Sequence, residues 1–183
     1  MNPRLRTELS RISAPILRLL FAPQLYGKQP QKIFENAVNW LLSLAGFQTI
    51  YLGFEITTSK GRKKFDSLTA KESGIPIGST DIIAFEENYR LLLVDCDIGG
   101  IDDNKIDKLL GACKRLAESS GFNKFSFVPV LCTPKECEVR TKKGVTVVDK
   151  LVLEGILEEV AKGNRKEARE KIIIGHGYVG TAL

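Results

Sequence analysis

The chain has little of the chemistry that metal-thiolate sites and membrane proteins need. Its 183 residues include one histidine and four cysteines, with no Cys-x-x-Cys pair. This composition argues against a structural zinc site, which needs four closely spaced Cys or His ligands. No segment approaches the roughly 18 uninterrupted apolar residues of a membrane span, and Arg11 and Arg18 interrupt any apolar signal core. We therefore expect a cytoplasmic protein without a membrane partner, whose cysteines are reduced thiols in the core.

What is present is the composition of an ordinary globular domain. Hydrophobic residues make up 43% and charged residues 27% of the chain, which excludes a disordered or collagen-like protein. Lys and Arg number 27 against 22 Asp and Glu, a net charge of +5. This mild basic surplus suits an anionic partner such as nucleic acid.

The apolar pattern predicts a layered α/β domain with a mixed sheet. We expect a basic helical extension at 1–29, the α/β domain at 30–174 and a flexible Gly-rich tail with His176 at 175–183. Helices are predicted over 1–25 (with a break at Pro15), 30–45, 102–119, 149–161 and 164–171. Strands are predicted over 48–56, 80–85, 90–97, 125–131 and 145–148, and residues 57–77 read as a long exposed loop. The predicted buried stripes are Phe34, Val38, Leu41, Leu42 and Ala45 on one helix, and Ile106, Leu109, Leu110, Cys113 and Ala117 on another.

Three aspartates gather at the predicted hairpin. Asp95 and Asp97 lie two apart on a strand and share one face. A three-residue turn centred on Asn88 places Asp81 opposite Asp95, whereas a two-residue turn shifts the register by one and separates them. Like charges that face each other destabilise a sheet. Either the aspartates are solvated at a sheet edge, or a cation neutralises them, and oxygen ligands favour Mg²⁺ or Mn²⁺.

Glu35 is a fourth acidic candidate. It lies seven residues before Leu42 and so at nearly the same azimuth as a core residue of the predicted helix. A carboxylate at the margin of a buried stripe is unusual. It either joins the aspartates, if the helix packs on the hairpin, or lies exposed at the helix edge.

These residues resemble a known family. Glu35 on an early helix, the run Gly78-Ser79-Thr80-Asp81-Ile82-Ile83-Ala84-Phe85 and the run Leu92-Leu93-Val94-Asp95-Cys96-Asp97 are similar to the PD-(D/E)xK nuclease superfamily. The later run Gly144-Val145-Thr146-Val147-Val148-Asp149 resembles the closing strand of its Mrr-like members. The resemblance implies a restriction-endonuclease-like three-layer fold, a central mixed β-sheet flanked by helices. It also implies a metal-dependent endonuclease that hydrolyses phosphodiester bonds in DNA.

The resemblance also implies a role for each matched position. Asp81 and Asp95 would hold Mg²⁺ or Mn²⁺, with help from the backbone carbonyl of Cys96, and Glu35 would be the helix carboxylate. Asp97 occupies the position where most members have lysine, although some active restriction enzymes of the family carry an acidic residue there. Lys105 or Lys108, early in the next predicted helix, could supply the missing positive charge.

Two other functions stay open. The absent lysine is compatible with a catalytically inactive nuclease-like module that binds nucleic acid or supports assembly. Gly78-Ser79 followed by Asp95-x-Asp97 loosely resembles a nucleotidyltransferase motif, but that motif opens a helix, and residues 80–85 read as a strand.

Basic residues lie just before the acidic hairpin. Lys60, Arg62, Lys63 and Lys64 are either phosphate contacts in the predicted loop or a solvated charge cluster. We expect DNA as the partner, together with a second copy of the chain or a larger complex.

Overall fold

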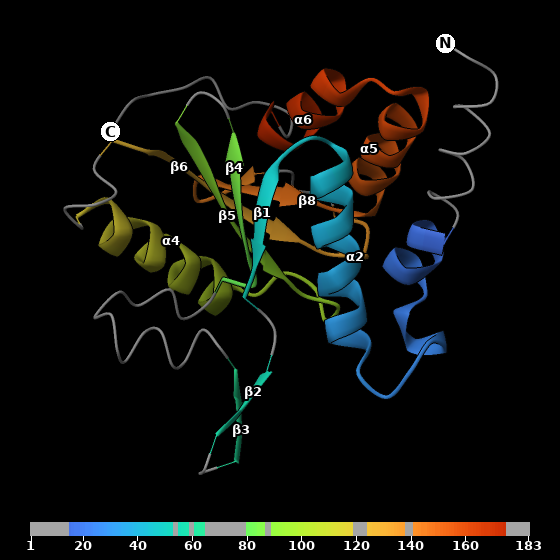
Figure 1. Ribbon diagram of the computed structural model, residues 1–183. Helices are drawn as coiled ribbons and strands as arrows, with labels where there is room; N and C mark the ends of the chain where they lie inside the picture. The colour runs from blue at the N-terminus through green and yellow to red at the C-terminus, as the bar shows by residue number, and fades with distance from the viewer. Residues whose placement is uncertain are drawn as a thin grey trace.

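The computed structural model describes residues 15–52, 55–58, 61–64, 80–86, 89–118, 124–137 and 141–174. Its centre is a six-stranded mixed sheet with helices on both faces (Figure 1). The predicted α/β class and the arrangement of a central mixed sheet flanked by helices are confirmed. Of the catalytic candidates, Asp95 lies on a central strand of this sheet, Asp81 and Asp97 directly flank central strands, and Glu35 and Lys105 lie on helices.

The sheet has the strand order β1-β4-β5-β6-β8-β7. Its strands are β1 (Gln48–Tyr51), β4 (Ile82–Glu86), β5 (Arg90–Cys96), β6 (Ser126–Cys132), β7 (Thr141–Lys142) and β8 (Val145–Val148). Strand β5 runs antiparallel to β4 and parallel to β6, so it has a paired strand along each edge. Its two faces are covered by the two hydrophobic clusters of the core. The four aliphatic residues 91–94 are buried, as a strand with both faces covered requires.

One face of the sheet is covered by α2 (Pro30–Leu44), α5 (Lys150–Lys162) and α6 (Arg165–Ile174). The predicted stripe of α2 is buried, and Gly46, at φ +96°, follows the end of the helix. Helix α5 is capped by Asp149, whose side chain accepts a hydrogen bond from the Val152 N–H. Residues 15–21 are α-helical, and the short 3₁₀ helix η1 (Pro23–Leu25) follows them.

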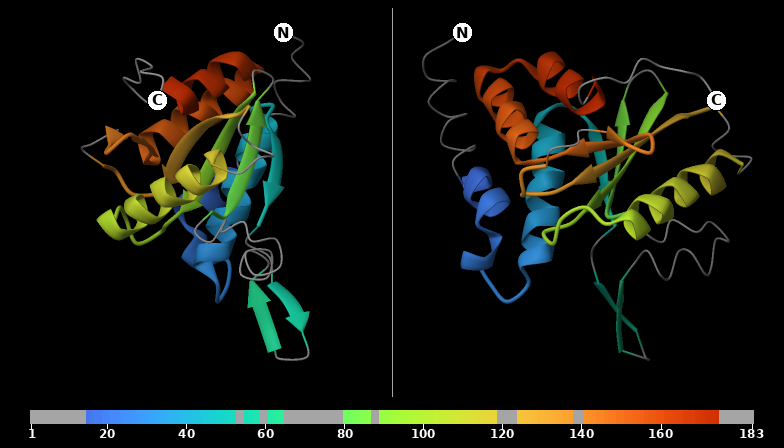
Figure 2. Two further views of the ribbon diagram at one scale, coloured as in Figure 1. Left: turned by 90° about the vertical axis from the view of Figure 1, so that its left-hand side faces the viewer. Right: turned by 180° about the vertical axis from the view of Figure 1, so that it is seen from behind.

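The other face is covered by α4 (Asp103–Ala117), as the view from behind in Figure 2 shows. Asp102 caps it by accepting from the Asn104 N–H at 2.8 Å. The predicted buried stripe is right at Ile106 and Leu109 but wrong at its end, because Leu116 is buried and Ala117 is exposed. Leu116 follows Leu109 by seven residues and so keeps the same helical azimuth.

The prediction that residues 57–77 form a loop is wrong, because two paired strands lie at the start of this range. The strands β2 (Glu55–Thr58) and β3 (Gly61–Lys64) pair antiparallel, and Figure 1 shows this hairpin projecting from the body of the protein. The β-branched run Ile56-Thr57-Thr58 favours a strand, and the basic residues after it concealed that signal. The predicted strand 48–56 is accordingly two strands, β1 and the start of β2.

The hairpin β4–β5 has the predicted register. Ile82 pairs with Val94 and Glu86 with Arg90, so three residues separate the strands and Asp81 falls opposite Asp95. Asn88, the predicted centre of the turn, lies outside the described residues, as do residues 1–14 of the predicted first helix and the tail with His176.

Two further predictions can be compared with this structure. All four cysteines are free; Cys96 and Cys132 are buried, and Cys113 and Cys137 are half-buried. Within the described part of the chain, no helix has both the length and the apolar character needed to cross a membrane.

Candidate active site

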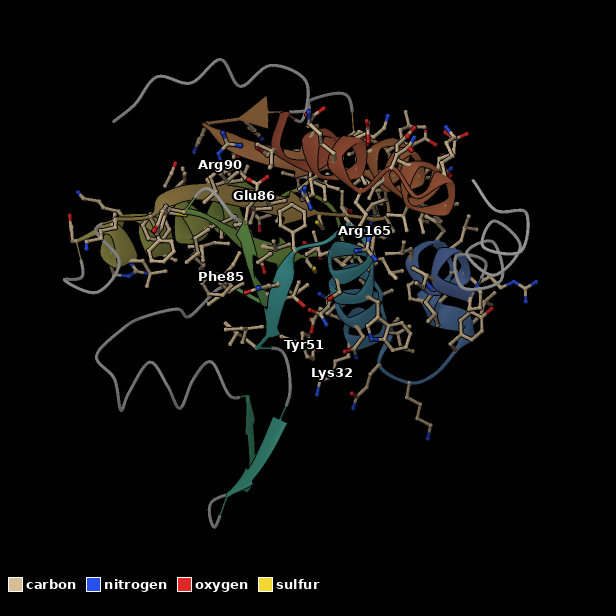
Figure 3. All side chains as sticks on the ribbon, turned by 45° about the horizontal axis from the view of Figure 1, so that its top comes forward. Lys32, Tyr51, Phe85, Glu86, Arg90 and Arg165 are labelled. Carbon is tan, nitrogen blue, oxygen red and sulfur yellow. The ribbon has the colours of Figure 1, made fainter. Side chains whose placement is uncertain are left out.

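The acidic residues meet at one end of the central strands. This end is formed by the start of β4, the end of β5, the first two turns of α2 and the first turn of α4. Figure 3 shows Tyr51 and Lys32 at this end, whereas Glu86 and Arg90 lie at the opposite end of the β4–β5 hairpin.

Asp81 and Asp95 form the centre of the site. The Asp81 N–H donates to the carbonyl of Val94 at 2.9 Å, and its carbonyl accepts from the Leu52 N–H at 2.7 Å. Its Oδ2 accepts from the Cys96 N–H at 2.8 Å. The register of the hairpin places the Asp95 carboxyl group opposite Asp81.

The environment of Asp95 favours its neutral form. Burial raises the pKa of Asp95 from 3.8 to about 6. The hydrogen bond from Asp81 and the charge of Lys105 act against this rise, and the charges of Asp97 and Glu35 add to it. A carboxyl group with a raised pKa beside charged partners is typical of functional sites.

Asp97 and Lys105 form an ion pair beside this centre. Lys105 Nζ lies 2.7 Å from Asp97 Oδ2, and Asp97 Oδ1 accepts from the Gly99 N–H at 2.7 Å. Partial burial alone would lower the pKa of Lys105, but the hydrogen bond and charge of Asp97, with the neighbouring aspartates, raise it overall. The structure thus brings Lys105 to the acidic centre, whereas Lys108 lies exposed on α4.

Glu35 is buried, at 1% exposed, so its predicted exposed alternative is wrong. Its Oε2 accepts from the Tyr51 hydroxyl at 2.9 Å, and its Oε1 accepts from Gln31 Nε2 at 3.0 Å. Burial, followed by the charge and hydrogen bond of Glu35, raises the pKa of Tyr51 well above its usual range, which keeps the hydroxyl a neutral donor. Glu35 therefore lies in a hydrogen-bond network next to the aspartate pair.

The backbone of Cys96 belongs to the same network. Its carbonyl accepts a hydrogen bond from Gln31 Nε2. Its thiol lies on the face of the sheet that α2 covers, in the core beside Cys132, where burial and that neighbour raise its pKa. The thiol is a core group, as expected.

The donor set of the aspartate pair fits a hard divalent cation. Asp81 and Asp95 offer only oxygen ligands, the kind that Mg²⁺ and Mn²⁺ prefer. In the described ranges, no three His, Cys, Asp or Glu side chains are grouped so that they could hold one ion. The roles of Glu35 and the Cys96 carbonyl as ligands accordingly stay predictions, and both groups already accept hydrogen bonds.

The predicted basic cluster is placed only in part. Arg62, Lys63 and Lys64 lie on β3 of the projecting hairpin, and Lys60 lies outside the described residues. Gly78 and Ser79 of the nucleotidyltransferase motif are also outside them, but the chain that follows forms strand β4 and not a helix.

Gln31 and Tyr51 were not among the residues predicted for the site. Gln31 precedes Glu35 by four residues, and this i, i+4 spacing on one helix face was an available signal. Tyr51 had no such signal, because its contact with Glu35 depends on how β1 packs against α2.

In comparisons with known proteins, no family model and no curated protein matches this chain. Among solved structures, it is similar to the small subunit of the heterodimeric restriction endonuclease R.BspD6I. The identity is 14%, the TM-score is 0.44, and the match covers 88% of this chain and 97% of that chain.

Proposed function

We propose that this protein is a nuclease that hydrolyses phosphodiester bonds in DNA with the help of Mg²⁺ or Mn²⁺. The observation that carries the proposal is the hairpin register that places Asp81 opposite Asp95, with the ammonium of Lys105 held beside them by Asp97 at 2.7 Å. Asp81 and Asp95 would hold the ion, and both side chains come from the predicted motif positions. When bound, the ion would polarise the phosphate and lower the pKa of a water molecule.

The residues of the chain have separate tasks in this proposal. Asp95, once ionised, orients the attacking water or takes its proton. Lys105 offsets the negative charge that develops on the phosphate, in place of the lysine that most family members carry at the position of Asp97. The basic residues 62–64 on the projecting hairpin bind the DNA backbone, which adds affinity without sequence preference.

A second candidate function rests on the Asp97–Lys105 contact. In this ion pair of 2.7 Å, Asp97 already compensates the positive charge of Lys105 that the cleavage proposal needs. This observation favours a nuclease-like module that binds nucleic acid without cleaving it.

The test is cleavage of supercoiled plasmid DNA by the purified protein, with Mg²⁺, Mn²⁺ or EDTA. The parent should nick or linearise the plasmid with either metal and not with EDTA. Asp95→Asn should abolish cleavage. Asp107→Asn is the matched control, because it makes the same change at an exposed aspartate of α4, and it should cleave like the parent. Metal-independent binding without cleavage would favour the second candidate, and cleavage retained by Asp95→Asn would contradict the proposed site.

A further inference from the structure

We propose that Gln31 is the positioning residue of this site, and that its side-chain amide acts as a surrogate strand that fixes the end of β5 and with it Asp95 and Asp97. The inference rests on the proposed function for its catalytic consequence. It rests on the contacts of Gln31 alone for its structural content.

On its β4 side, the end of β5 has no backbone hydrogen-bond partner among the residues that the structure describes. Pairing of β4 with β5 ends at the hydrogen bond from the Asp81 N–H to the Val94 carbonyl. Beyond that point, the Cys96 N–H donates to the Asp81 carboxyl group. On the other side of the strand, the ladder continues, because the Asp97 N–H donates to the carbonyl of Cys132 at 2.9 Å.

Gln31 supplies the missing bonds. Its Nε2 donates to the Cys96 carbonyl, and its Oε1 accepts from the Ile98 N–H at 3.2 Å. A neighbouring strand bonds residues i and i+2 in this way, with one N–H and one C=O. The second N–H of Nε2 donates to Glu35 Oε1. All three polar groups of the amide are thus used, and only the amide orientation with Nε2 toward the two acceptors satisfies them.

Asp97 lies between the two residues that Gln31 holds, and Asp95 directly precedes them. Freedom of the Cys96–Ile98 backbone would therefore move both carboxyl groups relative to Asp81 and Lys105. A misplacement of about 1 Å in a catalytic site can lower a rate by about 100-fold. Gln31 would thus affect turnover without touching the DNA.

The variant Gln31→Met keeps the length of the side chain and removes its three hydrogen bonds. Gln29→Met is the matched control, because Gln29 is exposed two residues earlier and makes no side-chain cap to the helix. We expect kcat of plasmid cleavage to fall at least about tenfold in Gln31→Met, with KM for DNA within about twofold. Gln29→Met should retain both values.

Amide hydrogen exchange tests the anchor without reference to activity. The Ile98 amide should be protected in the parent and exchange at least about tenfold faster in Gln31→Met, with no change in Gln29→Met. An unprotected Ile98 amide in the parent overturns the proposal, even if the variant does not fold. So does a folded Gln31→Met that loses this protection and keeps the parent kcat. If the parent cleaves no DNA, the proposed function fails, while the exchange data still decide whether Gln31 anchors the strand.

Discussion

Asp95→Asn should abolish cleavage and at the same time stabilise the protein. The asparagine resembles the neutral form of Asp95, which burial favours in the folded protein. The pKa of Asp95 is 3.8 in an ordinary environment and about 6 in the fold. Because a carboxyl group with a raised pKa holds its proton more tightly when folded, its contribution to stability is full below pH 3.8. This contribution is lost progressively as the pH rises, and it is gone above about pH 6.

The size of the effect follows from the two pKa values. A difference of about 2 units corresponds to a destabilisation of about 3 kcal/mol by ionised Asp95 at pH 7.5, and to only about 0.5 kcal/mol at pH 4. The variant removes this term, so it should be more stable than the parent by as much as about 3 kcal/mol at pH 7.5. For a chain of this size, each kcal/mol raises the melting temperature by about 2–4 °C.

The assay is thermal or urea unfolding, followed by circular dichroism, at pH 4 and pH 7.5 without divalent metal. The difference between variant and parent should be large at pH 7.5 and nearly vanish at pH 4. Asp107→Asn, at an exposed aspartate that pairs with Lys143 on the surface, should change stability by less than about 1 kcal/mol at both values. An Asp95→Asn protein that is less stable than the parent at pH 7.5, or equally shifted at both pH values, would refute this reasoning.

Three other predictions follow from the described contacts. Lys105→Met should lower the cleavage rate by about 100-fold. Lys108→Met removes the same charge from the exposed face of α4 and should leave the rate unchanged. Equal rates for the two variants would exclude Lys105 as a catalytic lysine. Alanine at the basic residues 62–64 should reduce the dependence of log K for duplex DNA on log salt by about 3, measured by fluorescence anisotropy, and an unchanged slope would remove the hairpin from the DNA interface. Tyr51→Phe removes the hydroxyl that donates to the buried Glu35 carboxylate, and it should lower the free energy of unfolding by about 1–3 kcal/mol. The same change at exposed Tyr26 should alter this free energy by less than about 0.5 kcal/mol. Equal effects of the two variants in urea titrations would contradict the role of the Tyr51 hydroxyl.

Local patterns predicted much of this architecture. The period of α2 and α4 and the register that places Asp81 opposite Asp95 both depend on residues close in the sequence. The hairpin β2–β3 was missed because a short strand pair with basic residues looks like a polar loop.

The contacts of the site depend on longer distances along the chain and were harder to predict. Gln31 meets Cys96 across 65 residues, and Tyr51 meets Glu35 only when β1 packs on α2. The contact of Lys105 with Asp97 was within reach of the sequence, because both flank a short connection from a strand to a helix. Which of several nearby lysines makes that contact depends on how α4 leaves the sheet.

The central claim is that Asp81 and Asp95 together bind a hard divalent ion. Titration of Mn²⁺ into the protein without DNA, followed by electron paramagnetic resonance, tests it most directly. The account predicts saturable binding by the parent that Asp95→Asn abolishes and Asp107→Asn retains. Absence of binding to the folded parent, or equal binding to parent and Asp95→Asn, would contradict it.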